Sequence, residues 1–390
     1  MVRGGDGSDT LSISDVVNTT PVLFSGTGAT SVNLSGALLD AVTATGIEAV
    51  ELRGASGSRL QIEGTAGNDR YEIDAANGRG TYSSTANPTL TFEQFEDFTL
   101  SGGTAGGMDQ VLVQGTLGND SVTVDIDSIT LGTNSVTFAD IDQLTLQMLA
   151  GDDVLTVDVD ETALIGAALE YDGGSGADTL VITGTPTVAV DEVIYQVGPS
   201  VSGGRLTYEA GDDSRLMSLE FTNLEPVLDD VTAGTLTVRG TDGNNVLTYV
   251  NGTGTNGTET NGLVSVDGFE TLEFTNKGIL VLDGGAGQDT LELRHTSSPT
   301  GLTSIVVRGG DGSDTLSISD VVNTTPVVFS GTGATSVDLS GALLTDVTAT
   351  GIEAVELRGA SGSSTLQIEG TAGNDRYEID AANGRGRAWR

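Results

Sequence analysis

The chain has no cysteine, a single lysine, a single histidine and a single tryptophan. Without cysteine it forms no disulfide and has no thiolate metal or redox site. Aromatic residues make up 4% of the chain, so Val, Leu, Ile and Thr must supply the core, and these residue types favour strands. No apolar run approaches the roughly 18 residues that span a bilayer. No signal peptide is visible either.

Basic residues are also scarce: 16 Lys and Arg stand against 55 Asp and Glu, which gives a formal net charge of −39. A surface of this sign repels the phosphates of nucleic acids and of anionic membranes. Its natural partners are hard cations, Ca²⁺ above all, because these prefer oxygen ligands. The alternative role of these Asp and Glu residues is to keep a long extracellular protein soluble. We therefore expect no nucleic-acid partner and no membrane insertion.

The sequence repeats itself on a long period. Residues 2–80 return with few changes as residues 307–386, about 305 positions later. This predicts one long period over 2–306, the start of the next over 307–386, and a divergent tail over 387–390 that holds Trp389. A tandem array is typical of surface and scaffold proteins, whereas a single catalytic domain has little reason to start over.

A shorter pattern recurs inside the long period. It reads apolar, acid, any, apolar, any, apolar, at spacings near 45 residues or near twice that, which predicts about seven degenerate sub-repeats. It occurs at residues 47–52, 95–100, 141–146, 224–227, 269–274 and 352–357, with a degenerate form at 190–193. Such alternation predicts half-buried strands whose successive side chains point inward and outward.

Glycine–aspartate turns separate these predicted strands. The consensus is G-x-x-G-x-D-x-apolar-x-apolar, found at residues 64–73, 115–124, 173–182 and 284–293. Asp153 and Asp178, like Asp289 and Asp314, are 25 residues apart, which is the length of one coil of a parallel β-helix. Asn-Gly hairpin turns are scarce, which disfavours antiparallel pairing. We therefore predict an all-β fold: an elongated, right-handed parallel β-helix, or β-solenoid.

Four turns carry a more specific signature. Residues 4–12, 173–181, 284–292 and 309–317 resemble the GGxGxDxUx nonapeptide of the haemolysin-type (RTX) calcium-binding repeat proteins. The resemblance implies secretion and Ca²⁺ held by stacked glycine-rich turns. The ligands that it implies, with the stacked Asp153 added, are Asp6, Asp9, Asp153, Asp178, Asp289, Asp311 and Asp314.

This sequence departs from the family in one respect. The family runs its nonapeptides back to back, whereas here each stands alone, so only stacking of distant turns could bring two together. The alternative is a plain turn in which Asp caps the backbone and no metal binds. In composition the chain also resembles the large repeat proteins of bacterial surfaces, namely adhesins and filament proteins.

The sequence gives little support to an enzyme. Parallel β-helices do carry polysaccharide-active enzymes, but Lys277 and His295 each lie in a polar stretch where we expect a neutral or turn residue. We expect the carboxylate pairs at 152–153, 212–213 and 229–230 to lie in solvated turns. No Gly-x-Ser-x-Gly, phosphate-loop or histidine metal motif is present.

The sequence-based prediction of function is therefore mechanical. We expect a non-enzymatic extracellular rod or filament of bacterial origin, such as a stalk, a matrix protein or an adhesin shaft, with Ca²⁺ as a possible stabiliser of its turns. Its expected partners are further copies of itself and, at its surface, glycans. The alternative is a secreted binding module that depends on Ca²⁺.

Overall fold

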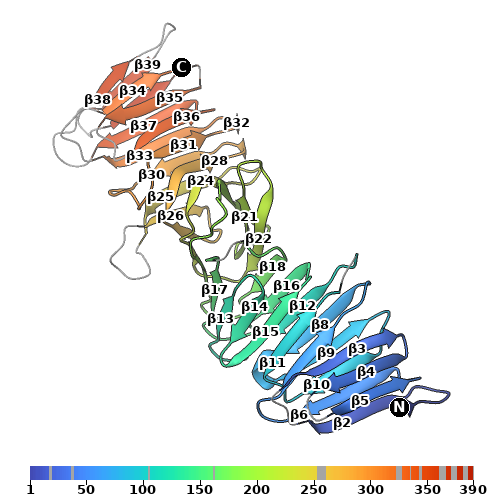
Figure 1. Ribbon diagram of the computed structural model, residues 1–390. Helices are drawn as coiled ribbons and strands as arrows, with labels where there is room; N and C mark the ends of the chain where they lie inside the picture. Colours follow the sequence, from blue (N-terminus) through green and yellow to red (C-terminus); the bar gives the residue numbers. More distant parts are fainter. Residues whose placement is uncertain are drawn as a thin grey trace. The chain divides into compact units, whose positions relative to one another are not determined.

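A computed structural model of the 390-residue chain describes residues 1–16, 20–36, 39–103, 106–160, 163–252, 261–321, 327–333, 335–341, 345–359, 366–369, 376–380 and 385–389. In these residues the protein is all-β: the elements are the strands β1 to β40 and one 3₁₀-helix, η1 (Ala75–Asn77) (Figure 1). None of the helical segments described is long and apolar enough to cross a membrane.

The chain divides into two compact units. The first comprises Met1–Val159, Ala163–Thr179 and Leu219–Asn223, and the second comprises Asp160–Thr162, Leu180–Ser218 and Leu224–Arg390. Two strands, β19 (Thr179–Thr183) and β22 (Arg215–Thr222), have residues in both units. The units do not divide at residue 306, where the sequence period does.

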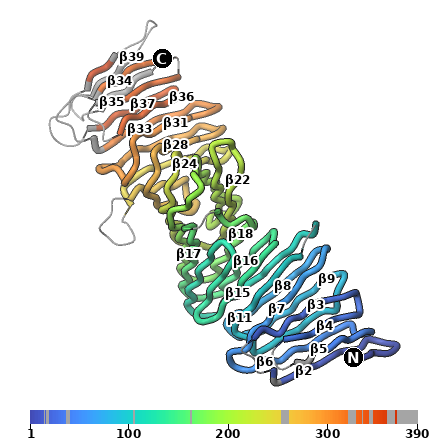
Figure 2. The backbone as a smooth tube through the Cα atoms, viewed as in Figure 1, coloured from blue at the N-terminus to red at the C-terminus, as the bar shows by residue number. Residues whose placement is uncertain are grey.

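In the first unit, strands far apart in the sequence pair in parallel. Figure 2 shows β7 (Arg59–Glu63), β11 (Asp97–Ser101) and β15 (Asn134–Ala139) side by side. A second parallel set consists of β8 (Asp69–Asp74), β12 (Gln110–Gln114), β16 (Gln143–Gln147) and β18 (Ala168–Asp172). The other strands of this unit outside its antiparallel segments are β1 (Val2–Arg3), β2 (Thr10–Val16), β6 (Ala49–Gly54) and β17 (Val154–Asp158).

The second unit is built in the same way. One parallel set is β24 (Ala233–Arg239), β28 (Lys277–Asp283), β31 (Ser304–Arg308) and β36 (Asp346–Thr350). Another is β25 (Val246–Asn251), β30 (Thr290–Leu293), β33 (Thr315–Val321) and β37 (Ala354–Gly359). The other strands outside its antiparallel segments are β23 (Val227–Asp229), β29 (Ala286–Gly287), β32 (Asp311–Gly312) and β38 (Leu366–Glu369). The strands β39 (Arg376–Asp380) and β40 (Arg385–Trp389) pair antiparallel with each other.

The core consists of rows of apolar side chains that run from strand to strand. Burial alternates along the strands as predicted, because successive side chains point to opposite faces. In the second unit, for example, Leu236 lies opposite Leu280, which lies opposite Ile305, and all three are fully buried. Each row therefore adds the same kind of contact with every strand.

The scarcity of Asn-Gly turns wrongly disfavoured antiparallel pairing. Between some parallel strands the chain forms antiparallel segments, whose turns use isolated positive-φ residues such as Gly132 (φ 62°) in place of Asn-Gly pairs. In the first unit these segments are β3 (Val22–Gly28) to β5 (Leu39–Thr45) through β4 (Ser31–Gly36), β8 to β10 (Thr89–Glu93) through β9 (Arg79–Ser84), and β13 (Ser121–Val124) to β15 through β14 (Ser128–Leu131).

In the second unit the antiparallel segments are β20 (Glu192–Val197) with β21 (Gly203–Glu209), β25 to β27 (Leu272–Phe274) through β26 (Gly262–Val266), and β34 (Val327–Gly331) to β36 through β35 (Val337–Gly341). These insertions explain why neighbouring parallel strands are 25 residues apart in some places and more than 40 in others: Leu280 lies opposite Ile305 without an insertion, and Ile305 lies opposite Val347 with one.

The two sequence copies form the same strand pairs in their own units. In the first copy Thr10 of β2 lies opposite Ala49 of β6, and in the second Thr315 of β33 lies opposite Ala354 of β37. The pairs β3–β7 and β34–β38 correspond in the same way. Residues 387–389 of the predicted tail belong to β40, which pairs antiparallel with both β37 and β39.

Candidate functional site

The glycine–aspartate turns are the most repeated feature of both units. We call each one a corner, meaning the six residues from its first glycine to its last acid or amide: residues 4–9, 64–69, 115–120, 173–178, 240–245, 284–289 and 309–314. A Cβ on the first glycine would lie only 2.5 to 2.8 Å from a side-chain oxygen of that last residue. At Gly309 it would also lie 1.9 Å from the carbonyl oxygen of Gly351. The first glycine is therefore required by close approach.

The last residues of the corners form backbone-to-carboxylate bonds with one another or with Asp109 and Asp153, which stack on them. In the first unit the Asp153 backbone N–H donates to Asp178 Oδ1 over 2.8 Å. In the second unit the Asp289 N–H donates to Asp314 Oδ1, also over 2.8 Å. The same bond joins Asp69 to Asp109, Asp109 to Asp142, Asp120 to Asp153 and Asn245 to Asp289. We call this series the corner ladder.

The acid of the shorter sequence pattern extends the same ladder. Glu353 Oε2 accepts the N–H of Asp314 over 2.7 Å, and Glu48 Oε2 accepts the N–H of Asp9 over 2.7 Å. Asp142, the acid of another copy of the pattern, accepts the N–H of Asp109. The two sequence motifs thus supply successive acceptors within the same runs of hydrogen bonds, such as Asn245 to Asp289 to Asp314 to Glu353, a link that their separate consensus sequences did not indicate.

The corners use their second position in two ways. Where it is threonine, as at Thr65 and Thr116, its N–H and hydroxyl both donate to the second oxygen of the corner aspartate, Asp69 or Asp120. In the corners 284–289 and 309–314, where it is glycine, one corner instead packs directly on the other. A Cβ at Gly310, whose φ is +103°, would lie 1.9 Å from the Gly285 carbonyl oxygen.

This close packing leaves part of a carboxylate without a partner. The β29 and β32 segments of two successive Gly-Gly corners pair in parallel, with Ala286 opposite Asp311. In these corners the Oδ2 atoms of Asp289 and Asp314 are buried and form no hydrogen bond, and the same holds for Asp153 Oδ2 in the first unit. The threonine corners therefore give the second carboxylate oxygen a hydrogen-bond donor, whereas the corners of Asp289 and Asp314 bury this oxygen without one.

Burial changes the acidity of these carboxyls. Loss of solvent raises the pKa of Asp153, Asp289 and Asp314 above its ordinary value, since the charged form is the one that water stabilises. A neighbouring carboxylate, Asp178, Asp314 or Glu353 respectively, raises it further, and the backbone N–H bond of the ladder opposes the change. Asp109 follows the same pattern.

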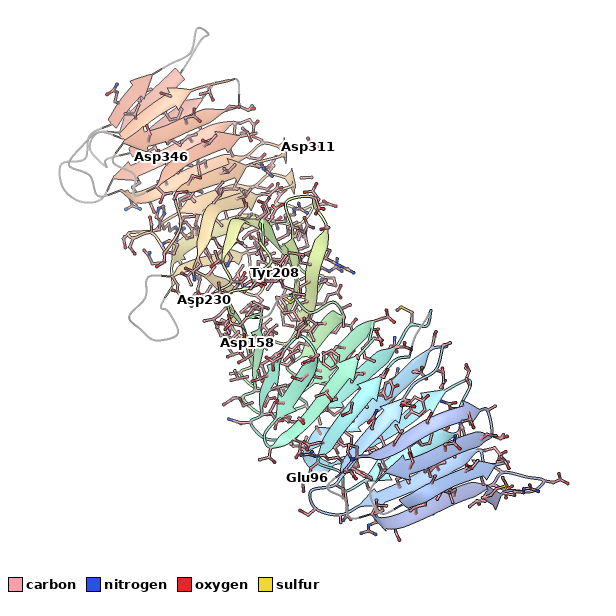
Figure 3. The ribbon with its side chains drawn as sticks, in the orientation of Figure 1. Glu96, Asp158, Tyr208, Asp230, Asp311 and Asp346 are labelled. Carbon is pink, nitrogen blue, oxygen red and sulfur yellow. The ribbon has the colours of Figure 1, made fainter. Side chains whose placement is uncertain are left out.

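The structure confirms that Asp289 and Asp314 stack, and that Asp153 and Asp178 stack. It separates Asp6 and Asp311 from the ladder, because both are exposed; Asp311 is labelled in Figure 3. Asp9 is only half-buried, and its Oδ2 accepts the Gly5 N–H over 2.7 Å. Asp375, in the equivalent weaker motif of the second copy, lies outside the described residues.

The ligand set implied by the RTX resemblance does not assemble as a carboxylate cluster. Across the described part of the chain, no three Asp, Glu, His or Cys side chains gather closely enough to hold a metal ion. Each ladder carboxylate presents one oxygen to a backbone N–H, whereas Ca²⁺ takes about six to eight oxygen ligands. The contacts described for the corner carboxylates are backbone-capping bonds, and their calcium role stays a prediction.

Sequence reasoning missed a buried ion pair in the second unit. Lys277 does not lie in a turn: it begins β28 and is fully buried, with Nζ 3.2 Å from Asp229 Oδ1. Nζ also donates to the carbonyl oxygens of Asp229, Val231 and Thr275. Burial lowers the pKa of Lys277, and the Asp229 charge opposes that shift. Its uniqueness in the sequence was the only available signal.

The prediction that the carboxylate pairs lie in solvated turns is right for some of their members and wrong for others. Asp152 and Asp212 are exposed, as predicted, but Asp153 and Asp229 are buried, so the prediction is wrong for them. The reason is that Asp153 and Asp229 turn inward to bond to backbone groups: Asp229 Oδ1 accepts the Val231 N–H over 3.0 Å. A run of two acids therefore does not mark a turn that is wholly in water.

His295 also lies in a more defined environment than a neutral loop. Its ring packs on that of Tyr249 with 4.7 Å between centroids, and neither ring nitrogen forms a hydrogen bond. Burial lowers the pKa of His295 to about 4, so the ring is neutral at physiological pH. This arrangement provides no acid–base partner and no metal ligand set.

A polar groove is lined by residues of six strands of the first unit: β2, β6, β8, β9, β10 and β12. Its charged walls include the ion pairs Arg53–Glu93 and Arg79–Asp74, at 3.2 and 2.9 Å. The other side chains and backbone that line it belong to Ser12, Ser14, Glu51, Leu52, Glu72, Ile73, Gly80, Thr81, Thr91, Phe92 and Gln114. The groove has hydroxyl and carboxylate groups but no exposed aromatic ring among its residues.

Comparison with protein-family models gives no match, and comparison with curated proteins gives no significant relative. The functional argument therefore depends on the geometry and the sequence of this chain.

Proposed function

We propose that the protein is an extracellular structural repeat protein whose chain winds as a right-handed parallel β-helix and serves as a rod: a stalk, matrix element or adhesin shaft. The observation that carries this proposal is the corner ladder. Its bonds, such as Asp289 N–H to Asp314 Oδ1, join the same position of successive corners and lie in the interior. They stabilise the stacking of strands and leave no recognisable reactive group.

The energetic logic is that of repeat proteins, in which each repeat contacts only its neighbours and stability adds up along the chain. A hydrogen bond to a charged group contributes about 1.5–3 kcal/mol. The apolar rows contribute again at every strand, as in Leu236, Leu280 and Ile305. A longer chain of this kind adds the same hydrogen bonds and apolar contacts with every strand and needs no larger core. This property is suited to a long rod.

The duplicated segment supports an assembly made of more than one period. Both copies form the same parallel pairs, β2–β6 and β33–β37 among them, although they lie in different units. A segment that folds in the same way twice can do so in a longer array or in a neighbouring molecule. We propose copies of this protein as its main partner, and a bacterial cell surface as its location.

Electron microscopy and small-angle scattering of the purified chain test the rod. We expect elongated particles that join end to end as concentration rises, with the same far-ultraviolet circular dichroism in calcium and in chelator. Compact particles that stay monomeric would contradict the rod. A gain of β-structure with Ca²⁺ and its loss with chelator would favour the alternative, a calcium-dependent secreted binding module.

The polar groove of the first unit favours one secondary role, the binding of surface glycans. Its hydroxyl, amide and carboxylate groups are of the kind that hydrogen-bond sugar hydroxyls. Binding would be weak without an aromatic platform. Glycan-array screening of the chain tests this role, with Arg53→Ala as the variant that should reduce any signal. Release of shortened products from the glycan would instead favour a polysaccharide-active enzyme.

A further inference from the structure

The buried ion pair of the second unit brings together the two groups that form an amide. Lys277 Nζ lies 3.2 Å from Asp229 Oδ1, and both side chains are fully buried. An amine and a carboxyl group form an amide when they lose one water. Groups held in a reactive geometry in this way reach effective molarities of about 10⁵–10⁸ M. The fold therefore supplies the proximity that this slow reaction lacks in solution.

Backbone carbonyl groups hold the amine in place. Nζ donates to the carbonyl oxygens of Val231 and Thr275, and also to that of Asp229 over 3.4 Å. An ammonium group has three N–H donors, so the third one faces Asp229 when two of them serve Val231 and Thr275. Transfer of this third proton to the carboxylate leaves a neutral amine whose lone pair is directed at the carboxyl group.

The two carboxylate oxygens of Asp229 have different surroundings. Oδ1 accepts the Val231 N–H over 3.0 Å, whereas Oδ2 is buried and has no hydrogen bond. Oδ1 is therefore already bound as the carbonyl oxygen of an amide would be. Oδ2 is the oxygen that can leave without breaking a contact with the backbone.

The phenol of Tyr208, on β21, lies beside this carboxyl group. Its hydroxyl is buried and has no hydrogen bond, and the residue is labelled in Figure 3. Burial raises the pKa of Tyr208, and the nearby Asp229 carboxylate raises it further. The phenol thus keeps its proton and can donate a hydrogen bond to Oδ2 as negative charge develops there.

Burial also favours a neutral product over two ions. Loss of solvent lowers the pKa of Lys277 and raises that of Asp229, although each charge opposes the shift of the other. Both shifts favour the neutral amine and the carboxylic acid, which are the forms that react. Two ions in a dry interior carry a desolvation cost that their attraction offsets only in part. An amide carries no such cost.

We propose that Lys277 and Asp229 join in the folded chain through an isopeptide bond, which links the first residue of β28 covalently to the last residue of β23. The Nζ–Cγ bond forms and the Cγ–Oδ2 bond breaks. Oδ2 leaves as water with two of the three ammonium protons, and the third proton stays on the amide nitrogen. The step needs no oxidant, reductant or further reactant. The ion pair described above is the state before the reaction.

The cross-link would change how the second unit responds to force. It joins positions 48 residues apart, so a pull on the two ends of the chain could not extend the residues between them. The chemistry depends only on the buried pair. The cross-link can therefore form whether or not the protein serves as a rod.

Mass spectrometry of the folded wild-type chain tests the proposal. We expect its mass to be lower than the sequence mass by one water, or to fall by one water during incubation at physiological temperature. Because Lys277 is the only lysine, a tryptic digest should contain residues 216–239 joined to residues 240–294 and no free peptide 240–277. A chain that keeps its full mass over days of incubation would overturn the proposal. Loss of water with residues 240–277 still released would also overturn it, and would indicate a succinimide elsewhere.

Two variants locate the bond. Asp230→Ala changes the exposed neighbour of Asp229 and should still give the joined peptides. Asp229→Ala removes the carboxyl group and should keep its full mass. Joined peptides in Asp229→Ala, or a bond found at Asp230 by fragmentation, would overturn the assignment. Circular dichroism verifies that each variant is folded, and the wild-type digest decides the case if Asp229→Ala is not.

Tyr208→Phe tests the hydrogen bond to the departing oxygen. Removing one such donor should slow the loss of water about 100-fold, while the product remains the same pair of joined peptides. The time course of intact mass measures this, with the wild-type chain beside it. Equal rates in the two chains would overturn this role of Tyr208.

Discussion

Two regions of the second unit bury a carboxylate in opposite ways. Asp229 has a cation beside it, the ammonium group of Lys277, and accepts the Val231 N–H as well. Asp289 in its corner has no cation beside it: Oδ1 accepts the Asn245 N–H, and Oδ2, like Oδ2 of Asp229, has no hydrogen bond. Both side chains are 1% exposed, so the difference lies in their partners.

The two sites differ in what stabilises the buried carboxylate: a partner charge at Asp229 and backbone hydrogen bonds at Asp289. The ion pair depends on both of its members, because either one alone would be an uncompensated charge in the interior. The corner carboxylate depends on backbone geometry that recurs along the chain, and it can shed its charge by binding a proton. The ion pair of Lys277 and Asp229 occurs once, whereas the buried corner carboxylate recurs along the chain.

Removing the cation should have the largest effect. Lys277→Met leaves Asp229 charged and buried, which we expect to lower the free energy of unfolding by about 3–5 kcal/mol. The double variant with Asp229→Leu removes both charges and should recover most of the loss. Urea unfolding followed by circular dichroism measures both. A single variant as stable as the wild type would show that the pair is not buried as described.

The corner carboxylate should show a smaller loss. Asp289→Ala removes the acceptor of the Asn245 N–H and leaves that donor unpaired, which we expect to cost about 1.5–3 kcal/mol. Asp289→Asn keeps the acceptor and removes the buried charge, so its stability should stay within about 1 kcal/mol of the wild type. Asn245 already occupies a ladder position naturally. Equal losses in the two variants would mean that the charge, and not the acceptor, matters.

Much of this framework could be predicted from the sequence. Alternating apolar runs gave the strands and their inward faces, and the 25-residue spacing gave the stacking of Asp289 on Asp314, because both signals are local and periodic. The antiparallel segments were missed because their turns depend on single residues such as Gly132. A lone positive-φ glycine leaves no characteristic pair in the sequence.

The site was harder to predict than the strands. Asp9 occupies the fixed aspartate of the RTX consensus and Asp6 a variable position, but the consensus does not say which carboxylate turns inward, because that depends on how the corner packs against its neighbour. Lys277 gave no periodic signal at all, since its partner Asp229 lies 48 positions earlier in another strand. Contacts between distant strands, and not local patterns, decide which charged groups are buried.

His295 is a third titratable group of the second unit, and it differs from Asp229 and Asp289 because its buried ring nitrogens form no hydrogen bond at all. Its folded pKa is about 4, below its ordinary 6.5. The stability that it contributes is therefore full above pH 6.5 and is lost as pH falls towards 4. His295→Leu should reduce the loss of stability between pH 8 and pH 5 by about 2 kcal/mol. Unfolding curves at both pH values measure this, with Ser297→Ala as a nearby control. An unchanged loss would place the ring in water.

The corner carboxylates should respond to acid in the opposite direction. Their folded pKa is raised, so their contribution is full below about 3.8 and is lost as pH rises through the folded pKa. In a His295→Leu background, stability should thus increase as pH falls from 7 towards 4. We expect a smaller change than that of His295, because the ladder N–H bonds oppose the shift. The double variant Asp289→Asn, Asp314→Asn should flatten the profile, and a persistent gain would assign it to the net charge.

The two kinds of corner offer the finest test of the comparison. In the first unit the Thr116 hydroxyl lies 3.1 Å from Asp120 Oδ2, whereas the equivalent atoms of Asp289 and Asp314 in two Gly-Gly corners have no hydrogen bond. Thr116→Val removes the hydroxyl, keeps the shape and makes the corner resemble the Gly-Gly type, which should cost about 1 kcal/mol. Thr130→Val, on the exposed face of β14, is the matched control and should change stability by less than about 0.5 kcal/mol. If both variants match the wild type, the second carboxylate oxygen needs no partner in either kind of corner, and the ladder bond alone is sufficient to hold the strands in register.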